Sequence, residues 1–590
     1  MDFTGNKHGT ISSSLRKKAV ERAIKGGGDL PPVAAKALKG IEDWERGLIT
    51  ARFLEHEGGR KLISMGSLAH RGGKTHGLGE NALQRSTRDG SGFSGSGTID
   101  INTRLQRAKD DAAEIRAKSM DQASLNMAAE RAIKIGYISP AQVHVLLDDI
   151  ELEGGVAEYY SKAKKELTQA HKKRYDKAAW SRAASKIMAI TMVIMAEGAE
   201  YPAKIATTMA DKIFGARDIK ISKDAEQRKA EMVFCGETAL NMHHAAFEAL
   251  LSGNSAKGVL IPEGYFEPLA VIPAIYDGDI QVVPTHDNGY KLKAERLEEI
   301  LNKAPKGSIA ALLMTIPCNP LGLEYSKDEL EAIGKVAVKH GLKIIVDEQF
   351  AGLYHDKKQK SVSMASLTVD VDGKPHDLYK HTLTIQGTTK LFDHERNKSG
   401  IACSGDTEWI RKIKDIIKRD VTGLTRHEVI ETGFAIDNTN LQKNSERLGR
   451  QFERLQKAID HANKIAGENV FSLLVKPDSG YFTVLTIPRE LGLKALIPNH
   501  EAFFLYTMLQ AGVEGRSIEG MGFDSTDKLG MRINFSHVRN DNDLEKDDMF
   551  QAFTRLGQMA KDIKEGKAPT LVEVMRHSLS KVVKNDPVRE

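Results

Sequence analysis

Three apolar runs in the middle of the chain each end at a short polar segment. The runs occupy residues 309–316, 342–346 and 383–385. Short apolar runs separated by a helical pattern, such as 326–340, predict buried parallel strands joined by crossover helices. In such sheets ligands bind beyond the carboxyl ends of the strands. We therefore expect the polar residues that follow the runs, Asn319, Asp347 and Lys390, to face one crevice.

These three polar side chains suit one cofactor. A lysine forms a Schiff base with an aldehyde, and a carboxylate that faces a pyridine nitrogen keeps it protonated, so that the ring becomes an electron sink. An amide side chain can donate a hydrogen bond to the phenolic oxygen of the ring. With Lys390, Asp347 and Asn319 in these roles, the pattern is that of a site for pyridoxal 5'-phosphate (PLP).

The motifs around these residues resemble those of the class I/II aminotransferases, which have PLP fold type I. Residues 319–322, Asn-Pro-Leu-Gly, resemble the family's Asn-Pro-Thr-Gly turn. Residues 347–350, Asp-Glu-Gln-Phe, resemble its Asp-Glu-x-Tyr strand end, and residues 388–390, Thr-Thr-Lys, resemble its Ser-x-Lys region. The resemblance extends over about 201–538 and leaves an N-terminal extension unassigned.

The resemblance implies a PLP-dependent aminotransferase that acts on an amino acid and a 2-oxoacid. Lys390 would form the internal aldimine and then move the proton at the substrate α-carbon, and Asp347 would be the second catalytic residue. Two alternatives stay open. A decarboxylase or lyase of fold type I uses the same residues, and aminotransferase-like domains also occur in non-catalytic regulators that carry a DNA-binding N-terminal region.

The resemblance also indicates which residues contact the cofactor phosphate. Gly236, Glu237 and Thr238 form a turn before a predicted helix, where free backbone N–H groups and the helix dipole favour an anion. Thr389 is a further residue that the resemblance assigns to cofactor binding. Tyr201 would reach the phosphate of the neighbouring subunit's cofactor.

A basic residue is expected eight positions after the lysine, where it pairs with the phosphate. That position holds Lys398 instead of the usual arginine, and a lysine carries the charge without the planar fork. Arg396 is the alternative. Phe350 also departs from the family, which usually has a tyrosine there that donates to the phenolic oxygen. Its absence should raise the pKa of the Schiff base.

Two further residues are assigned by resemblance. Tyr265 is the aromatic residue expected to stack on the pyridine ring, with Phe266 as the alternative. Arg532, in a predicted strand of the small domain, would hold the substrate α-carboxylate by a bidentate pair. Asn319 would contribute to the substrate site as well as to the cofactor site.

The predicted fold is α/β, with a mostly parallel sheet sandwiched by helices, a smaller α+β domain and a helical N-terminal extension. The expected divisions are an extension with a Gly/Ser-rich linker, the first part of the small domain, the large PLP-binding domain, and connecting helices with the rest of the small domain, at residues 1–150, 151–200, 201–410 and 411–590.

Composition and charge bear on whether the protein binds nucleic acid, enters a membrane or carries disulfides. The 590 residues carry 85 basic and 80 acidic side chains, and a net charge of +5 gives no basic field that would indicate nucleic-acid binding. The longest apolar run is about half a membrane span, and we expect no metal site. Three cysteines cannot build a disulfide framework, so a reducing cytoplasm is expected. The resemblance implies a homodimer.

Overall fold

A computed structural model describes most of the chain beyond residue 208 and parts of the region before it. The described residues are 32–36, 39, 63–64, 117, 120–134, 139–172, 183, 186–187, 189–190, 193, 209–235, 239–356, 361–391, 400–420, 441–523, 526–536 and 546–584. Six predicted or alternative site residues therefore lie outside the described residues: Tyr201, Gly236, Glu237, Thr238, Arg396 and Lys398.

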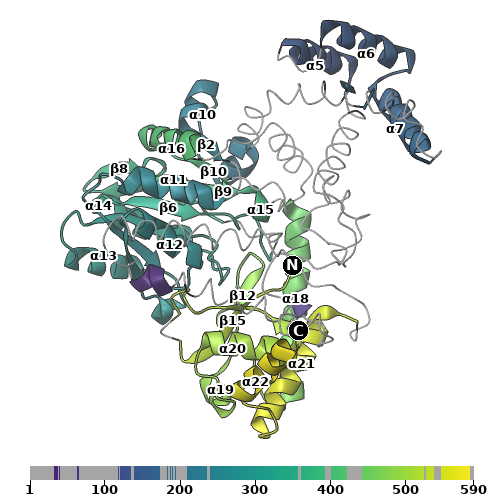
Figure 1. Ribbon diagram of the computed structural model, residues 1–590. Coiled ribbons are helices and arrows are strands. Elements are labelled where there is room, and N and C mark those ends of the chain that lie inside the picture. The colour runs from purple at the N-terminus through teal and green to yellow at the C-terminus, as the bar shows by residue number, and fades with distance from the viewer. Residues whose placement is uncertain are drawn as a thin grey trace.

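A seven-stranded sheet forms the centre of the larger domain (Figure 1). In spatial order its strands are β2 (Met232–Cys235), β10 (Gly400–Cys403), β9 (Thr382–Gly387), β6 (Lys343–Asp347), β5 (Ile309–Thr315), β3 (Gly258–Pro262) and β4 (Asp279–Val283). Strands β9, β6, β5, β3 and β4 are mutually parallel, whereas β10 is antiparallel to both of its neighbours. The predicted α/β class with a mostly parallel sheet is confirmed.

Helices cover both faces of this sheet. Side chains of α11 (Ala239–Leu251), α12 (Glu267–Ile275) and α16 (Thr407–Asp420) share one apolar core with the sheet. Those of α13 (Ala294–Lys303) and α14 (Lys327–Lys339) share another core with residues of β5 and β6. The remaining elements of this domain are η2 (Met209–Phe214), η3 (Gly215–Arg217), α10 (Ala225–Glu231), η4 (His286–Asn288), η5 (Met364–Ser366), β7 (Thr368–Val371), β8 (Lys374–Asp377), η6 (Leu378–Lys380) and α15 (Thr388–Leu391).

Local sequence signals set the limits of these elements. The hydroxyl of Ser326 accepts the N–H of Glu329, and the Glu329 carboxylate accepts the N–H of Ser326, so a capping box begins α14. The three central strands are buried nearly throughout, as their mainly apolar runs predict. The crossover helix and the strands therefore lie where the hydrophobic pattern places them.

A four-stranded antiparallel sheet with helices forms the smaller domain. Its strands, in spatial order, are β11 (Ser472–Leu473), β12 (Phe482–Pro488), β15 (Lys528–Asn534) and β14 (Arg516–Ser517). Its helices are α18 (Leu441–Ala466), α19 (Arg489–Lys494), α20 (His500–Tyr506), η7 (Thr507–Ala511), α21 (Asp548–Lys564) and α22 (Leu571–Lys584). One core joins α18 and α21 to β12 and β15. The predicted smaller α+β domain is confirmed.

Three helices in the leading region form a separate group (Figure 1). They are α5 (Gln122–Lys134), α6 (Pro140–Leu152) and α7 (Val156–Lys172). The predicted start of α6 is confirmed, because Ser139 and Gln142 form a capping box with Pro140 in the first turn. Side chains of α7 pack with α5 and α6 in one apolar cluster. Among the described residues, none from α5, α6 or α7 belongs to the buried core of the small domain.

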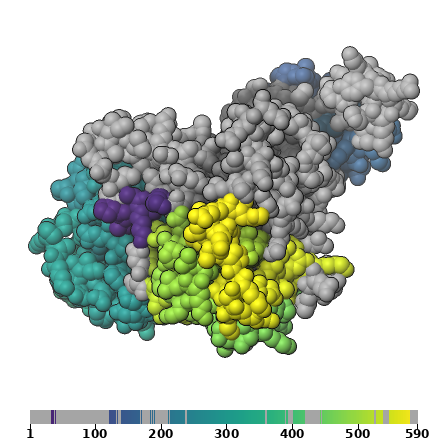
Figure 2. Space-filling model, turned by 60° about the horizontal axis from the view of Figure 1, so that its bottom comes forward, coloured from purple at the N-terminus to yellow at the C-terminus, as the bar shows by residue number. Residues whose placement is uncertain are grey.

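A short N-terminal helical segment, 32–36, lies against the main body of the protein. Ala34 is fully buried in the core that contains α11 and α12. Lys36 pairs with Glu519 at 3.6 Å, and Lys39 pairs with Glu501 at 3.5 Å, both in the small domain. Figure 2 shows this segment, in purple, over the boundary between the two domains.

Another short part of the leading region also joins the small domain. Strand β1 (Ile63–Ser64) pairs in parallel with β13 (Val513–Glu514). Of the two strands, β1 falls within residues 58–97, the stretch that the sequence assigns to a Gly/Ser-rich linker. Among the described helices, none combines the length and apolar character that crossing a membrane requires.

Candidate functional site

Asp347 ends β6 and is held by donors from two elements. Its Oδ2 lies 3.2 Å from Nε2 of His243 on α11 and accepts Nε2–H of Gln349 at 3.3 Å. Its Oδ1 accepts the backbone N–H of Gln349 at 3.1 Å. Asp347 is 4% exposed and His243 fully buried. Because these hydrogen bonds fix the orientation of the carboxylate, the arrangement suits a side chain that pairs with a cationic ligand.

Asn319 and Arg532 meet across the two domains. Nη1 of Arg532 donates to Oδ1 of Asn319 at 3.3 Å, and both side chains are buried. The guanidinium carbon lies 4.1 Å from the centre of the Phe482 ring, within the range of a cation–π contact. Asn319 follows β5 and Arg532 lies in β15, so this contact places the small-domain arginine at the carboxyl end of the large sheet.

Lys390 approaches the same aromatic ring. It lies in α15, directly after β9, and its Nζ is 5.9 Å from the centre of the Phe482 ring. Phe350, three residues after Asp347, makes an edge contact with Phe482 at 5.7 Å between ring centres. Phe482 therefore connects the lysine, the arginine and the end of β6. Only the backbone of Thr389 is described, within α15.

The turn after β5 contacts the segment that leads into β12 of the small domain. Gly322 has a φ of +67°, and a Cβ there would collide with the carbonyl oxygen of Ser479 and with Pro477. The backbone N–H groups of Asp478 and Ser479 both donate to the carbonyl of Gly322, at 2.9 and 3.0 Å. Glycine is therefore required here both for its conformation and for the close approach of the segment that leads into β12.

Tyr265 occupies a different position from the residues above. It is buried after β3, its N–H donates to the carbonyl of Met521 at 3.0 Å, and its ring lies against Gly522. It also lines a small cavity together with Thr315 and Cys318. Tyr265 thus lies between the large sheet and the loop after β14.

Several buried ionic groups surround the site. Burial lowers the pKa of Arg532 to about 9, with a further contribution from the nearby Arg516. Glu348 pairs with Arg217, yet burial keeps the pKa of Glu348 above its usual value. Burial also raises the pKa of Glu324 to about 7, although Ser479 donates to it at 2.8 Å.

Two of these site residues were not identified from the sequence. His243 lies three residues after Leu240 and four before Phe247, so it is a polar residue on a predicted apolar helix face, which is a usable signal. Phe482 carries no such signal, because an aromatic residue in a strand is ordinary. Only the tertiary structure brings it between Lys390 and Arg532.

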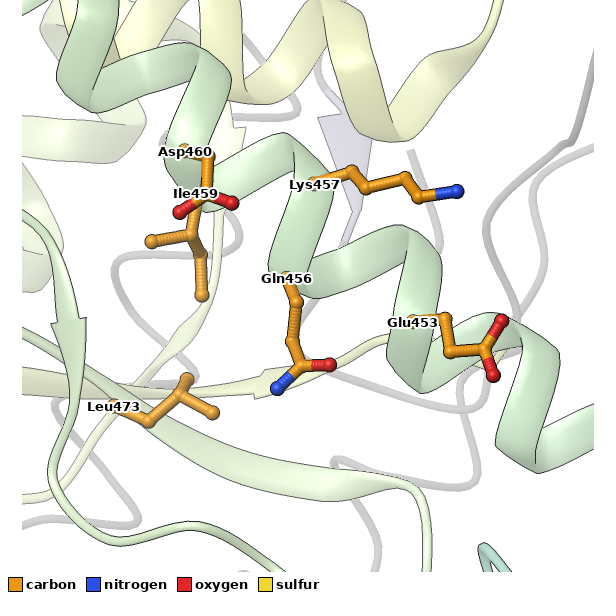
Figure 3. Close-up of a pocket in the computed structure, with 6 residues that line it drawn as sticks. All are labelled: Glu453, Gln456, Lys457, Ile459, Asp460 and Leu473. Carbon is orange, nitrogen blue, oxygen red and sulfur yellow. The ribbon is translucent and has the colours of Figure 1, made fainter.

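A surface hollow elsewhere in the molecule contains none of these groups. It is lined by Glu453, Gln456, Lys457, Ile459, Asp460 and Leu473, from α18 and β11 (Figure 3). Within the part of the chain that the structure describes, no group of three or more His, Cys, Asp or Glu side chains could hold a metal ion.

Comparison with known proteins shows what this chain is similar to. The asparagine–oxo-acid transaminase of Streptococcus mutans is 26% identical over 305 residues, which cover 51% of this chain and 70% of that protein. An aspartate aminotransferase of Pyrococcus abyssi is 27% identical over 268 residues, which cover 44% and 61%. The crystal structure of an aromatic aminotransferase from Pyrococcus horikoshii superposes with a TM-score of 0.50 at 20% identity, covering 61% of this chain and 86% of the other.

The chain also matches a whole family. Residues 202–544, more than half of the chain, match the sequence pattern that defines the aminotransferase class I and II family. The predicted family, cofactor and transferase class are therefore confirmed. This chain belongs to the aminotransferase class I and II family, whose members are PLP-dependent transferases.

Proposed function

We propose that Lys390, Asp347, Asn319 and Arg532 form the active site in which this enzyme transfers an amino group from an amino acid to a 2-oxoacid. The observation that carries the proposal is the meeting of Asn319 and Arg532 beside Phe482, which Lys390 also approaches. The names of the similar proteins, transaminases of asparagine, aspartate and aromatic amino acids, favour amino transfer over the decarboxylase and lyase alternatives.

The described residues fit the cofactor. When bound, PLP supplies an aldehyde for the amino group and a ring that delocalises electrons from the substrate α-carbon. The buried carboxylate of Asp347 is suited to hold a protonated ring nitrogen, because His243 and Gln349 keep it fixed by hydrogen bonds. Asn319 would bind the phenolic oxygen. Tyr265 remains the proposed ring contact.

The phosphate contacts stay proposals from the family pattern. Gly236, Glu237 and Thr238 would supply backbone N–H groups at the start of α11, and Thr389 and Lys398 would complete this end of the site. His243 lies in α11, which begins at Ala239. The proposed phosphate turn, residues 236–238, directly precedes that helix. That helix would therefore hold the cofactor at both its ring and its phosphate.

The other described residues bind and orient the substrate. Arg532 offers two parallel N–H donors to a carboxylate, which fixes both its position and its orientation. Lys390 would move the proton between the substrate α-carbon and the cofactor, since its Nζ reaches the same ring that supports Arg532. Phe482 would exclude water from the space between the two cations.

Replacement of Asp347 tests this proposal. Asp347→Ala removes the group that holds the ring nitrogen, so turnover should fall by several orders of magnitude even at saturating amino acid, while the protein still folds. The measurement is amino transfer from a panel of amino acids to two acceptors, pyruvate with one carboxylate and 2-oxoglutarate with two, with the keto acid product identified. Near-normal turnover in the variant would contradict the assignment.

We also propose a cytoplasmic homodimer. None of the three cysteines, Cys235, Cys318 and Cys403, forms a disulfide, which suits a reducing compartment. Sites of this family are usually completed across a two-fold axis, with Tyr201 as the proposed contribution from the partner. Light scattering of the active enzyme should give twice the mass of one chain, and an active monomer would refute the dimer.

A further inference from the structure

Two buried arginines lie side by side at the small-domain end of the site. Arg516 of β14 is directly opposite Arg532 of β15 in an antiparallel pair. Directly opposed residues point to the same face of a sheet, with Cβ atoms roughly 4.5–5.5 Å apart. Since Arg532 reaches Asn319 from that face, Arg516 also points toward the large domain. Two adjacent guanidinium groups could, in principle, hold the two carboxylates of a dicarboxylic substrate.

Arg516, however, already has a carboxylate. Its Nε donates to Oε1 of Glu267, the first residue of α12, at 3.1 Å. The Arg516 side chain is 9% exposed and that of Glu267 is fully buried. The guanidinium also lies 5.6 Å from the ring centre of Phe266. The carboxylate of Glu267 therefore occupies the position on Arg516 that a second substrate carboxylate would otherwise take.

Glu267 is poorly placed to give way to such a substrate. Its second oxygen, Oε2, is buried and accepts no hydrogen bond from the described residues. Displacement from Arg516 would leave a buried carboxylate without a cation, which is strongly unfavourable. Arg516, Arg532 and Glu267 together carry two positive charges and one negative charge. A single substrate carboxylate on Arg532 therefore balances these charges. A second one would leave a buried net negative charge.

We propose that Glu267 determines substrate specificity by occupying Arg516, so that the site accepts amino acids with one carboxylate and an uncharged side chain and discriminates against dicarboxylic ones. This inference rests on the proposed role of Arg532 as the α-carboxylate site. Glu267 acts through Arg516 and is a positioning residue. It works by rejecting the wrong ligand, because the attraction of Arg516 for anions is already satisfied.

Binding of two unreactive acids tests the proposal without turnover. Succinate and butyrate have the same number of carbon atoms but differ in having two carboxylates and one. Calorimetry on the PLP-loaded enzyme should show succinate binding no more than about threefold more tightly than butyrate. In Glu267→Gln the Arg516 charge is released, so the preference for succinate should increase about tenfold or more, a typical effect of a buried charge pair.

A matched control removes a charge without touching Arg516. Glu519→Gln, three residues beyond Arg516, changes the net charge equally, and among the described residues the ion pair that it breaks is the one with Lys36, so the succinate-to-butyrate ratio should stay as in the wild type. A folded Glu267→Gln with an unchanged ratio overturns the proposal. So does a wild-type enzyme that prefers succinate by more than about threefold, which decides the matter even if the variant fails to fold. Because no amino transfer is measured, failure of the proposed reaction is a separate result.

Discussion

His243 and Asp347 are joined by a contact of 3.2 Å although 104 residues separate them in the chain. The histidine is fully buried on α11, and the aspartate ends β6. A carboxylate oxygen can only accept, so Nε2 of His243 must carry the proton. Helix α11 therefore determines how the proposed ring-binding carboxylate is oriented.

Loss of this histidine should weaken the site through Asp347. In His243→Ala the carboxylate loses a charge-assisted hydrogen bond of about 1.5–3 kcal/mol, so PLP affinity should fall by at least tenfold and the visible absorption of the bound cofactor should shift. His244→Ala is the control, since His244 contacts Tyr276 instead. Unchanged affinity and spectrum in His243→Ala would exclude this role.

Replacement of Arg532 by lysine should affect the substrate and spare the cofactor. The lysine keeps a charge but loses the planar fork, and truncation of one partner of a buried charged pair costs about 2–5 kcal/mol. We expect the KM for the amino acid to rise by at least thirtyfold with PLP binding unchanged. Arg489→Lys, at the outer part of the small domain, is the control, and an unaltered KM in Arg532→Lys would show that the α-carboxylate binds elsewhere.

Gly322 should be sensitive to a single added carbon. In Gly322→Ala the new Cβ meets the carbonyl of Ser479, and such overpacking costs about 1–3 kcal/mol in the free energy of unfolding. Gly373→Ala provides a matched control, because Gly373 also has a positive φ of +75° but open space around it. Urea unfolding should show a larger loss for Gly322→Ala, and equal losses would mean that the two domains do not touch there.

Stability should depend on pH through Glu324. Its pKa rises from 4.5 to about 7 on folding, mainly by burial, so the folded state retains a proton that the unfolded state has lost. The stability contributed by this group is fully present below pH 4.5 and is lost as pH rises toward 7, by an amount on the order of 2–3 kcal/mol. Groups facing Glu324 are Arg217, Asp478, Glu348 and Ser479.

Glu324→Gln removes the titrating group. Its free energy of unfolding should therefore fall less than that of the wild type between pH 5 and pH 8. Glu331→Gln, on the outer side of α14, should follow the wild type. An identical pH dependence in Glu324→Gln would exclude the carboxyl of Glu324 as the source.

The sequence predicted the parts of the candidate site that local patterns carry. Asn319, Asp347 and Lys390 each follow a mainly apolar run, of the kind that buried parallel strands leave in a sequence. The family motifs added Arg532. The pair between Arg516 and Glu267 leaves no such pattern, since 249 residues separate the two and β14 is only two residues long. The sequence also carries no pattern that predicts the pairing of β1 with β13, because this pairing depends on the assembled small domain.

Covalent capture of the cofactor tests the identity of the site lysine most directly. Borohydride reduction of the PLP-loaded enzyme, followed by proteolysis and mass spectrometry, should place the added pyridoxyl phosphate mass on the peptide that contains Lys390. Lys390→Ala should fold, lose the visible absorption band and take up no such mass. Labelling of a different lysine, or an unchanged band in Lys390→Ala, would contradict the assignment of the active site.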